Sequence, residues 1–178
     1  QCAVYNDKNE RLQGNVIINV NGVNSLINAS TFKNSKANQG GAVYVDGVHT
    51  TISNSNFTDI SSENYGGAIF VAGSETNISE SNFLRCNVAK YHGGAIYIAG
   101  ENTNIENSNF TLCKALNNKV ETLGGAIAIE NGPNTLIKSS NFVECDAVDG
   151  GCVYLRRCHQ RFAVHLLDLH VGHQPVAL

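Results

Sequence analysis

Cysteine is the first residue type in this chain that could do chemistry, because a thiolate can bind a metal or attack an electrophile. Three of the six cysteines, Cys86, Cys113 and Cys145, each follow a phenylalanine by three residues. This recurrence predicts a column of core thiols that behave as small apolar side chains, whereas a zinc site needs ligands that converge. Stacking at about 4.8 Å also leaves a disulfide open between Cys86 and Cys113, or between Cys113 and Cys145, in an oxidising compartment.

Carboxylates are the second candidates, since glycoside hydrolysis uses two of them facing the bond to be cut. The position directly after each repeated strand reads Asn21, Asp46, Ala72, Ala99 and Glu130, so acids occur there singly. The other acids fall in bends at unrelated positions, which is typical of a solvated face. We therefore predict that the carboxylates form no catalytic pair.

Histidines complete the set of candidates for acid–base chemistry. His49 and His92 stand alone in expected loops, so no Ser–His–Asp set can be recognised. His165, His170 and His173 are spaced by 5 and 3 residues, which matches no standard zinc pattern. From these patterns we predict that the chain is not an enzyme and has no catalytic residue, no metal and no cofactor.

A repeat determines where all these residues lie. Double glycines begin at residues 40, 66, 93, 124 and 150, in phrases such as GGAVYVDG and GGAIYIAG. A second phrase, of the type ISNSNF, ends at Phe32, Phe57, Phe83, Phe110 and Phe142. From the second glycine to the next of these phenylalanines is 16 residues three times and then 17. A nearly fixed period of this size indicates stacked structural units.

Each unit contains about three short segments of alternating apolar and polar residues, and none carries the apolar stripe of a helix. One unit cannot close a sheet, but equal units can stack, with each strand pairing in parallel with its counterpart. The sequence therefore predicts an all-β parallel β-helix, a solenoid of about five rungs of about 26 residues with three short strands per rung. We expect a partial rung over residues 1–14, the repeats over 15–155 and a protruding loop at 116–123.

Stacking turns the repeated positions into columns. We expect an inner face built from the Ile columns, exemplified by Ile78, and from the Phe column. Serines two residues before each Phe share that inner face and can hydrogen-bond along the stack. Asn56, Asn82, Asn109 and Asn141 point outward as an asparagine ladder, and the paired glycines mark a corner that needs positive φ or close backbone approach.

The residue between two inward β-branched positions points outward in such a strand. That column reads Tyr44, Phe70, Tyr97, Ala128 and Tyr154. Exposed aromatic rings can stack on sugar rings or on another protein, so Tyr44, Phe70, Tyr97 and Tyr154 are the candidate ligand-binding residues. The alternative is a self-stacking ladder that only stabilises the sheet.

Residues 156–178 depart from the repeat. Asn, Ile and Lys are absent from residues 150–178, and four of the six histidines lie there. This divergent tail is best explained by a frameshift or a misassembled gene end, and the alternative is a cap that covers the open end of the solenoid.

The repeated phrases GGAIYIAG and ISESNF, with a cysteine three residues after the Phe, resemble the polymorphic outer-membrane-protein repeats of chlamydial autotransporters. They are also similar to the adhesin-like right-handed β-helix proteins of methanogenic archaea. The resemblance covers residues 15–155. It implies a right-handed β-helix on the cell surface or outside the cell, with the repeats forming an adhesive stalk.

Composition limits the partners of the chain. Its net charge of −3 offers no basic surface for nucleic acid. The sequence also lacks a run of 18 apolar residues, the length that a membrane-spanning helix needs. With no Met and no signal-peptide pattern, we interpret the chain as a fragment of a longer protein.

The leading hypothesis is a non-catalytic, adhesin-like structural repeat protein whose partner is a glycan or a protein on a host or neighbouring cell. The alternatives are a carbohydrate-active β-helix enzyme (a polysaccharide lyase or glycoside hydrolase, or its remnant) and a sugar-binding module.

Overall fold

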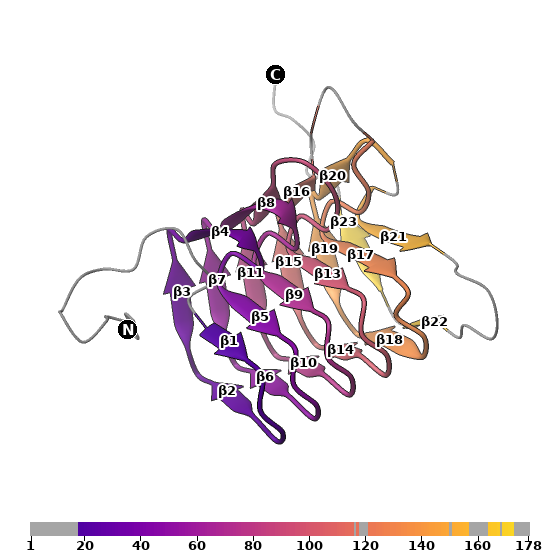
Figure 1. Cartoon of the computed structure of the whole chain (residues 1–178). Coiled ribbons are helices and arrows are strands. Elements are labelled where there is room, and N and C mark those ends of the chain that lie inside the picture. Colours follow the sequence, from indigo (N-terminus) through magenta and orange to yellow (C-terminus); the bar gives the residue numbers. More distant parts are fainter. Residues whose placement is uncertain are drawn as a thin grey trace, which may run out of the picture.

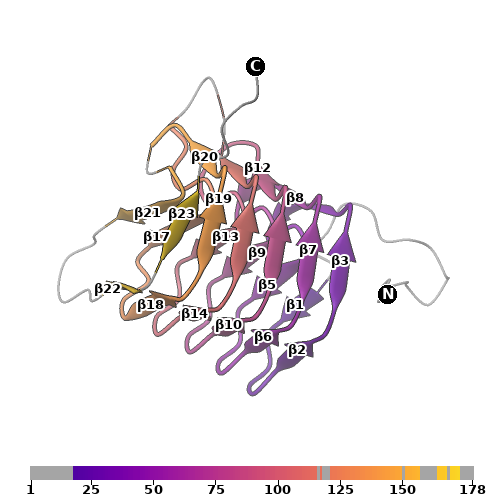
Figure 2. The same cartoon turned by 180° about the vertical axis from the view of Figure 1, so that it is seen from behind.

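The computed structural model describes residues 18–115, 117, 121–149, 151–156, 164–167 and 169–172. These residues form a solenoid without any helix, in which successive turns lie side by side along one axis (Figures 1 and 2). Every pair of neighbouring strands is parallel, and each strand pairs with its counterpart in the next turn. The predicted all-β parallel β-helix is confirmed.

Each complete turn contributes one strand to each of four sheets, three of which have six strands and one of which has five. The first sheet contains β1 (Ile18–Val20), β5 (Val43–Val45), β9 (Ile69–Val71), β13 (Ile96–Ile98), β17 (Ile127–Glu130) and β21 (Val153–Arg156). The second contains β2 (Leu26–Asn28), β6 (Thr51–Ser53), β10 (Asn77–Ser79), β14 (Asn104–Glu106), β18 (Thr135–Lys138) and β22 (Val164–Leu167). The third contains β3 (Thr31–Lys33), β7 (Asn56–Thr58), β11 (Asn82–Leu84), β15 (Asn109–Thr111), β19 (Asn141–Val143) and β23 (His170–Gly172). The fourth contains β4 (Lys36–Gln39), β8 (Ser61–Tyr65), β12 (Asn87–Val88), β16 (Lys114–Ala115) and β20 (Asp146–Ala147).

The fourth sheet is a difference from the sequence-based expectation of three strands per rung. Its strands are as short as two residues and carry polar side chains such as Asn87 and Lys114, so they lack the apolar alternation by which strands are recognised. Backbone hydrogen bonds to the neighbouring turns form them instead, for example from Asn87 N–H to the Ile60 carbonyl and from Lys114 N–H to the Cys86 carbonyl.

The corners explain the many asparagines and glycines of this chain. Each corner uses a residue with positive φ, a conformation that Gly and Asn adopt most readily. The fourth corner uses the first glycine of the first four pairs, as at Gly66 (φ 58°) and Gly93 (φ 74°). A Cβ on the second glycine, Gly67, would overlap the Gly94 carbonyl oxygen of the next turn. The predicted role of the paired glycines is confirmed. The other three corners repeat a non-glycine residue of positive φ, as in the column Asn24, His49, Glu75, Asn102 and Asn134.

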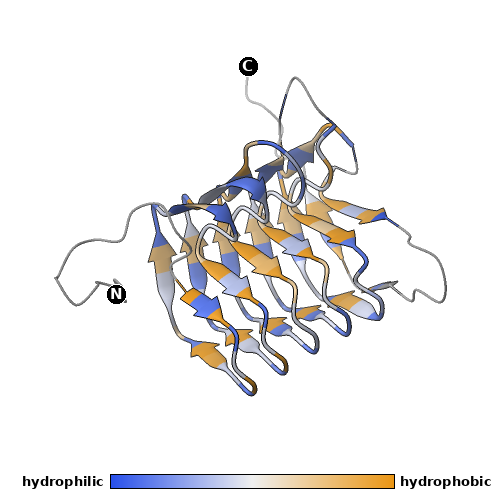
Figure 3. Cartoon of the chain, viewed as in Figure 1, coloured by the Kyte–Doolittle hydropathy of each residue, from blue (hydrophilic) through white to orange (hydrophobic). Residues whose placement is uncertain are grey.

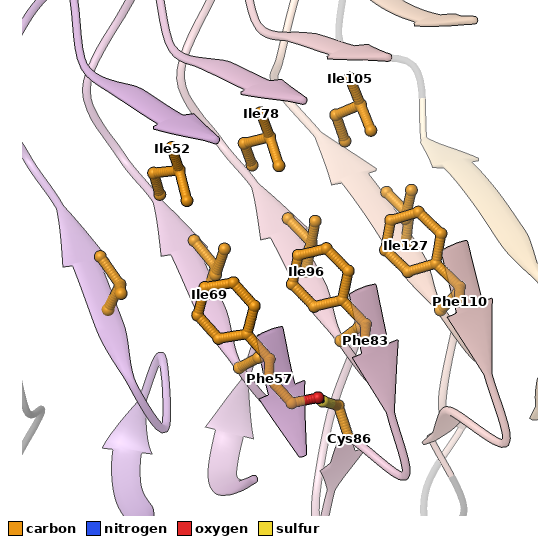
Figure 4. Packing of buried hydrophobic residues seen from close by; sticks show 14 of the residues in the cluster. Ile52, Phe57, Ile69, Ile78, Phe83, Cys86, Ile96, Ile105, Phe110 and Ile127 are labelled. Carbon is orange, nitrogen blue, oxygen red and sulfur yellow. The ribbon is translucent and has the colours of Figure 1, made fainter. Parts of the chain in front are cut away.

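The interior is a set of stacked apolar columns. Phe57, Phe83 and Phe110 stack with ring centroids 4.7 Å apart and planes within 3° of parallel. Figure 4 shows this row beside a row of isoleucines from the second sheet and a third row from the first sheet. In Figure 3 the same hydrophobic positions recur from strand to strand along the sheets. The predicted inner columns are therefore confirmed, including Ile78, which is 1% exposed.

Polar columns bond along the same axis. The N–H of Ser55 donates to Ser81 Oγ at 3.2 Å, and the N–H of Ser81 donates to Ser108 Oγ at 3.3 Å. These serines are fully buried beside the Phe column, as the sequence predicts. Buried hydroxyl groups are tolerated here because each serine also donates to a backbone carbonyl, as Ser81 does to Ser79 at 2.8 Å.

The described parts of the divergent tail continue the solenoid. β22 pairs with β18 so that Leu166 lies beside Ile137, and β23 pairs with β19 so that Val171 lies beside Phe142. Residues 1–14, the expected partial rung, and residues 116 and 118–120 of the expected protruding loop lie outside the described residues. His165 and His170 are exposed, and His173 also lies outside the described residues.

Replacing Ile78 by Asp is expected to lower the free energy of unfolding by at least about 4 kcal/mol, because an unpaired carboxylate would enter a fully apolar column. Urea unfolding followed by far-ultraviolet circular dichroism measures this. The matched control is Asn82→Ser on the outer face, which should cost no more than about 1 kcal/mol. Equal effects of the two changes would contradict the assignment of inner and outer faces.

Candidate functional site

The predicted aromatic column lies on the outer face of the first sheet. Tyr44, Phe70 and Tyr97 are in register on β5, β9 and β13, and Tyr154 follows two strands further on β21, after Ala128. Tyr44 and Phe70 stack with ring centroids 5.0 Å apart. The expected outward direction is thus correct, and the column also stacks on itself.

The expectation of an exposed stripe is wrong for two of these four residues. Phe70 is 8% exposed and Tyr97 is 7% exposed, and together with Ala128 they form a second apolar cluster outside the first sheet. Tyr44 and Tyr154 are half-buried. Flat ring faces are therefore not displayed over most of this column.

We call the segment of each turn between the third sheet and the double glycine, which contains the strand of the fourth sheet, the fourth side. Residues of the fourth side cover the aromatic column. Tyr65, at the end of β8, lies 4.7 Å from the Tyr97 ring and meets the Phe70 ring edge-on at 6.2 Å, measured between centroids. Tyr91 stacks on Tyr65 at 5.0 Å, and a β-bridge joins Tyr65 to His92. The sequence analysis missed this cover. Its signal is the bulky residue directly before a double glycine, as in NYGG and YHGG.

The covered column ends at a cluster of ionisable side chains. Tyr97 Oη donates a hydrogen bond to Glu130 Oε2 at 3.0 Å. His92 Nε2 and Arg156 Nη1 each lie 3.6 Å from Glu130 Oε1. His92 and Glu130 are mostly buried, whereas Arg156 is largely exposed. We call Tyr97, Glu130, His92 and Arg156 the Glu130 cluster. His92 is therefore not isolated, contrary to the sequence-based expectation.

The environment of the Glu130 cluster shifts the pKa values of Tyr97 and His92. Burial raises the pKa of Tyr97 far above its usual value, and the nearby Glu130 carboxylate raises it further. Burial and the Glu130 charge also raise the pKa of Tyr65. Burial lowers the pKa of His92, although Glu130 opposes this shift. At neutral pH the cluster therefore consists of neutral Tyr97 and neutral His92, with the Arg156 guanidinium beside the acid.

Two buried polar atoms of the cluster have no hydrogen-bond partner among the described residues, His92 Nδ1 and Glu130 Oε1. A carboxylate beside a histidine, a tyrosine and an arginine has the residue types of an acid–base site. A two-carboxylate hydrolytic mechanism also needs a second acid at the bond. The described polar contacts of Glu130 are with Tyr97, His92 and Arg156. A second acid, Glu121, is close enough to His92 to raise the pKa of that histidine.

Other acids lie along the corner beside the first sheet. Asp46 and Glu101 line one shallow groove of about 430 Å³, with Ala72 and Ala99 among its lining residues. His49, the other histidine expected to be isolated, lies at the same corner and has its Nδ1 2.6 Å from Glu75 Oε2. The second expectation of an isolated histidine is therefore also wrong.

The outer face of the third sheet carries the predicted asparagine ladder. Asn82 Nδ2 donates to Asn56 Oδ1 at 3.0 Å, Asn109 to Asn82 at 2.8 Å and Asn141 to Asn109 at 2.7 Å. Each amide oxygen within the ladder is thus used by the next turn, and the four side chains are exposed. The ladder is confirmed as a continuous outer column.

The cysteine column is confirmed as part of the core. Cys86, Cys113 and Cys145 are buried free thiols, and Cys152 is a half-buried free thiol. Cys86 Sγ donates to the Phe57 carbonyl at 3.6 Å, and Cys113 Sγ donates to the Phe83 carbonyl at the same distance. Burial raises the pKa of the Cys113 thiol well above its usual value. Within the described ranges, no three Cys, His, Asp or Glu residues are grouped as metal ligands.

Comparison with models of known protein families, with curated proteins and with solved structures finds no significant match. The β-solenoid fold and its surface are therefore the basis for a functional proposal. Within the described part of the chain, no helix is long and apolar enough to cross a membrane.

The raised pKa of Tyr97 predicts a loss of stability at alkaline pH. Above pH 10 the unfolded chain loses the phenolic proton that the folded chain retains, so the free energy of unfolding falls as pH rises. Tyr97→Phe should weaken this fall between pH 9.5 and 11 in urea titrations, the pH range being set by the usual tyrosine pKa of about 10. Glu130→Gln should weaken it less, since burial is the larger cause. An unchanged fall in Tyr97→Phe would contradict this account.

Proposed function

We propose that this chain is the β-helical part of a cell-surface or secreted adhesin-like structural protein and that it catalyses no reaction. The observation that carries the proposal is the uniform stacking of the turns. Inner columns, corner residues and the outer asparagine ladder keep one register over the described turns. Such a rod holds its outer faces at fixed spacing, which suits a stalk that presents contacts at a distance from a surface.

The Glu130 cluster supports a structural role within this proposal. Tyr97 bonds the carboxylate, Arg156 offsets its charge, and Tyr65 and Tyr91 cover the neighbouring rings. These contacts tie the fourth side to the first sheet. A buried carboxylate with a hydrogen bond and a cation beside it needs no substrate to explain its presence.

The location and partners follow from the resemblance to polymorphic outer-membrane-protein and adhesin-like repeats. We propose that the chain lies on the cell surface or outside the cell, and that its partner is a glycan or a protein on a host or neighbouring cell. The outer asparagine ladder and the groove with Asp46 and Glu101 offer amide and carboxylate groups to such a partner. The net charge of −3 gives no support to a nucleic-acid partner.

A carbohydrate-active enzyme, or the remnant of one, is the second candidate. One observation favours it: the Glu130 cluster brings a carboxylate, a histidine, a tyrosine and an arginine to one place on an outer face. A sugar-binding module that uses the aromatic column is less well supported, because Phe70 and Tyr97 are covered.

A combined binding and turnover assay on the folded full chain tests the proposal. Beads that carry the chain should be retained on a glycan array or a cell layer more than bare beads, without release of reducing ends or unsaturated uronates. Asn109→Ser is the control for the ladder and Glu130→Gln for the cluster. Turnover that is lost in Glu130→Gln would refute the non-catalytic proposal and establish the second candidate. Retention no greater than that of bare beads on every surface would refute the adhesive role.

A further inference from the structure

Two repeated positions lie at the two ends of the fourth side of each turn. The first position opens the fourth side, and the second follows the double glycine. The five described pairs are Ser35 and Ala42, Ile60 and Ala68, Cys86 and Ala95, Cys113 and Ala126, and Cys145 and Cys152. In the last pair alone, both residues are cysteine.

The thiol of Cys152 reaches the backbone of Cys145. Cys152 Sγ lies 3.8 Å from the Cys145 carbonyl oxygen, to which it donates, and the two thiol groups also interact with each other. Cys145 is 7% exposed, and Cys152 packs against the same apolar core while remaining half-buried. One thiol is therefore inside the solenoid, and its neighbour is open to solvent.

Cys113 is the competing partner, because its thiol also interacts electrostatically with that of Cys145. The two residues are stacked in neighbouring turns, where Asp146 N–H bonds the Cys113 carbonyl at 3.0 Å. Stacked side chains point the same way and keep the strand spacing of about 4.8 Å, whereas a disulfide needs Cβ atoms about 3.8 Å apart. Cys145 and Cys152 reach one another from the two ends of the fourth side, so their side chains can converge.

We propose that Cys145 and Cys152 form an intramolecular disulfide that closes the last described turn, by exchange with a low-molecular-weight disulfide such as oxidised glutathione. This inference goes beyond the proposed function and does not depend on it. At the position paired with Cys86 and with Cys113 the chain has alanine, so these two cysteines remain thiols.

The exchange proceeds in two balanced steps. The half-buried Cys152 thiolate attacks one sulfur of oxidised glutathione, which forms a mixed disulfide and releases one glutathione thiolate. The Cys145 thiolate then attacks the Cys152 sulfur, which forms the Cys145–Cys152 bond and releases the second glutathione. Two protein thiols are oxidised, one glutathione disulfide is reduced, and the two thiol protons leave to solvent or glutathione.

The neighbouring thiols make the reaction slow at neutral pH. Interaction with Cys113 raises the pKa of Cys145 to about 12, and interaction with Cys145 raises that of Cys152 further. Since the thiolate is the attacking species, the initial rate should rise about tenfold for each pH unit between 7 and 9.

Trypsin and mass spectrometry test the pairing on the full chain. Cys145 and Cys152 are the two cysteines of the tryptic peptide 139–156, whereas Cys113 lies in peptide 91–114. After incubation with oxidised glutathione, unfolding and alkylation, peptide 139–156 should be lighter by two hydrogens and carry no alkyl group. A cross-link between peptides 91–114 and 139–156, or two alkylated thiols in peptide 139–156 after incubation at pH 9, would overturn the proposal.

Cys152→Ala is the matched variant, because alanine occupies this position in four other turns. In the oxidised wild-type chain, a reductant should lower the urea midpoint of unfolding, and in Cys152→Ala it should not. Cys113→Ser should retain the two-hydrogen loss in peptide 139–156. Absence of this two-hydrogen loss in a folded Cys113→Ser chain would show that the bond depends on Cys113 and would overturn the proposal.

Discussion

The structure depends on one constraint, the parallel hydrogen bonding of each strand to its counterpart one turn away. This pairing places like positions beside each other at the strand spacing of about 4.8 Å. A side chain therefore has its nearest neighbours in its own column, and the Phe stack and the asparagine ladder both follow from that. Side chains alternate between the two faces of a strand, so a register shift of one residue would move all its apolar side chains from the inner face to the outer face. The apolar columns therefore require that every strand keeps the same register.

The same constraint acts on the corners. A chain that turns four times in about 26 residues needs backbone conformations that most residues avoid. Asparagine and glycine supply them at low cost, and among the described residues seven asparagines and five glycines have positive φ. His49 and Glu75 occupy one of these corner columns, and the contact between His49 Nδ1 and Glu75 Oε2 shows how side chains of neighbouring corners interact.

Features with a fixed period could be predicted from the sequence, and features that depend on the fourth side could not. The Ile, Phe, Ser and Asn columns follow from spacing alone, and all of them appear in the structure. The cover formed by Tyr65, Tyr91 and His92 arises where the repeat changes length, so no column position places it. The contact of His92 with Glu130 was missed for the same reason, because it joins a fourth-side residue to the end of β17. Half of the aromatic column is consequently buried by residues whose alignment the period does not fix.

The variable length of the fourth side has a consequence for how such a chain can change over generations. From the second glycine to the next Phe the spacing is 16 or 17 residues, whereas from Phe to the second glycine of the next pair it ranges from 9 to 15. Insertions and deletions in the gene are therefore absorbed on one flank, while the other three flanks hold the rod together. Differences in the length of a turn are therefore expected on that flank. A lineage can remodel the flank residue by residue without rebuilding the scaffold beneath it.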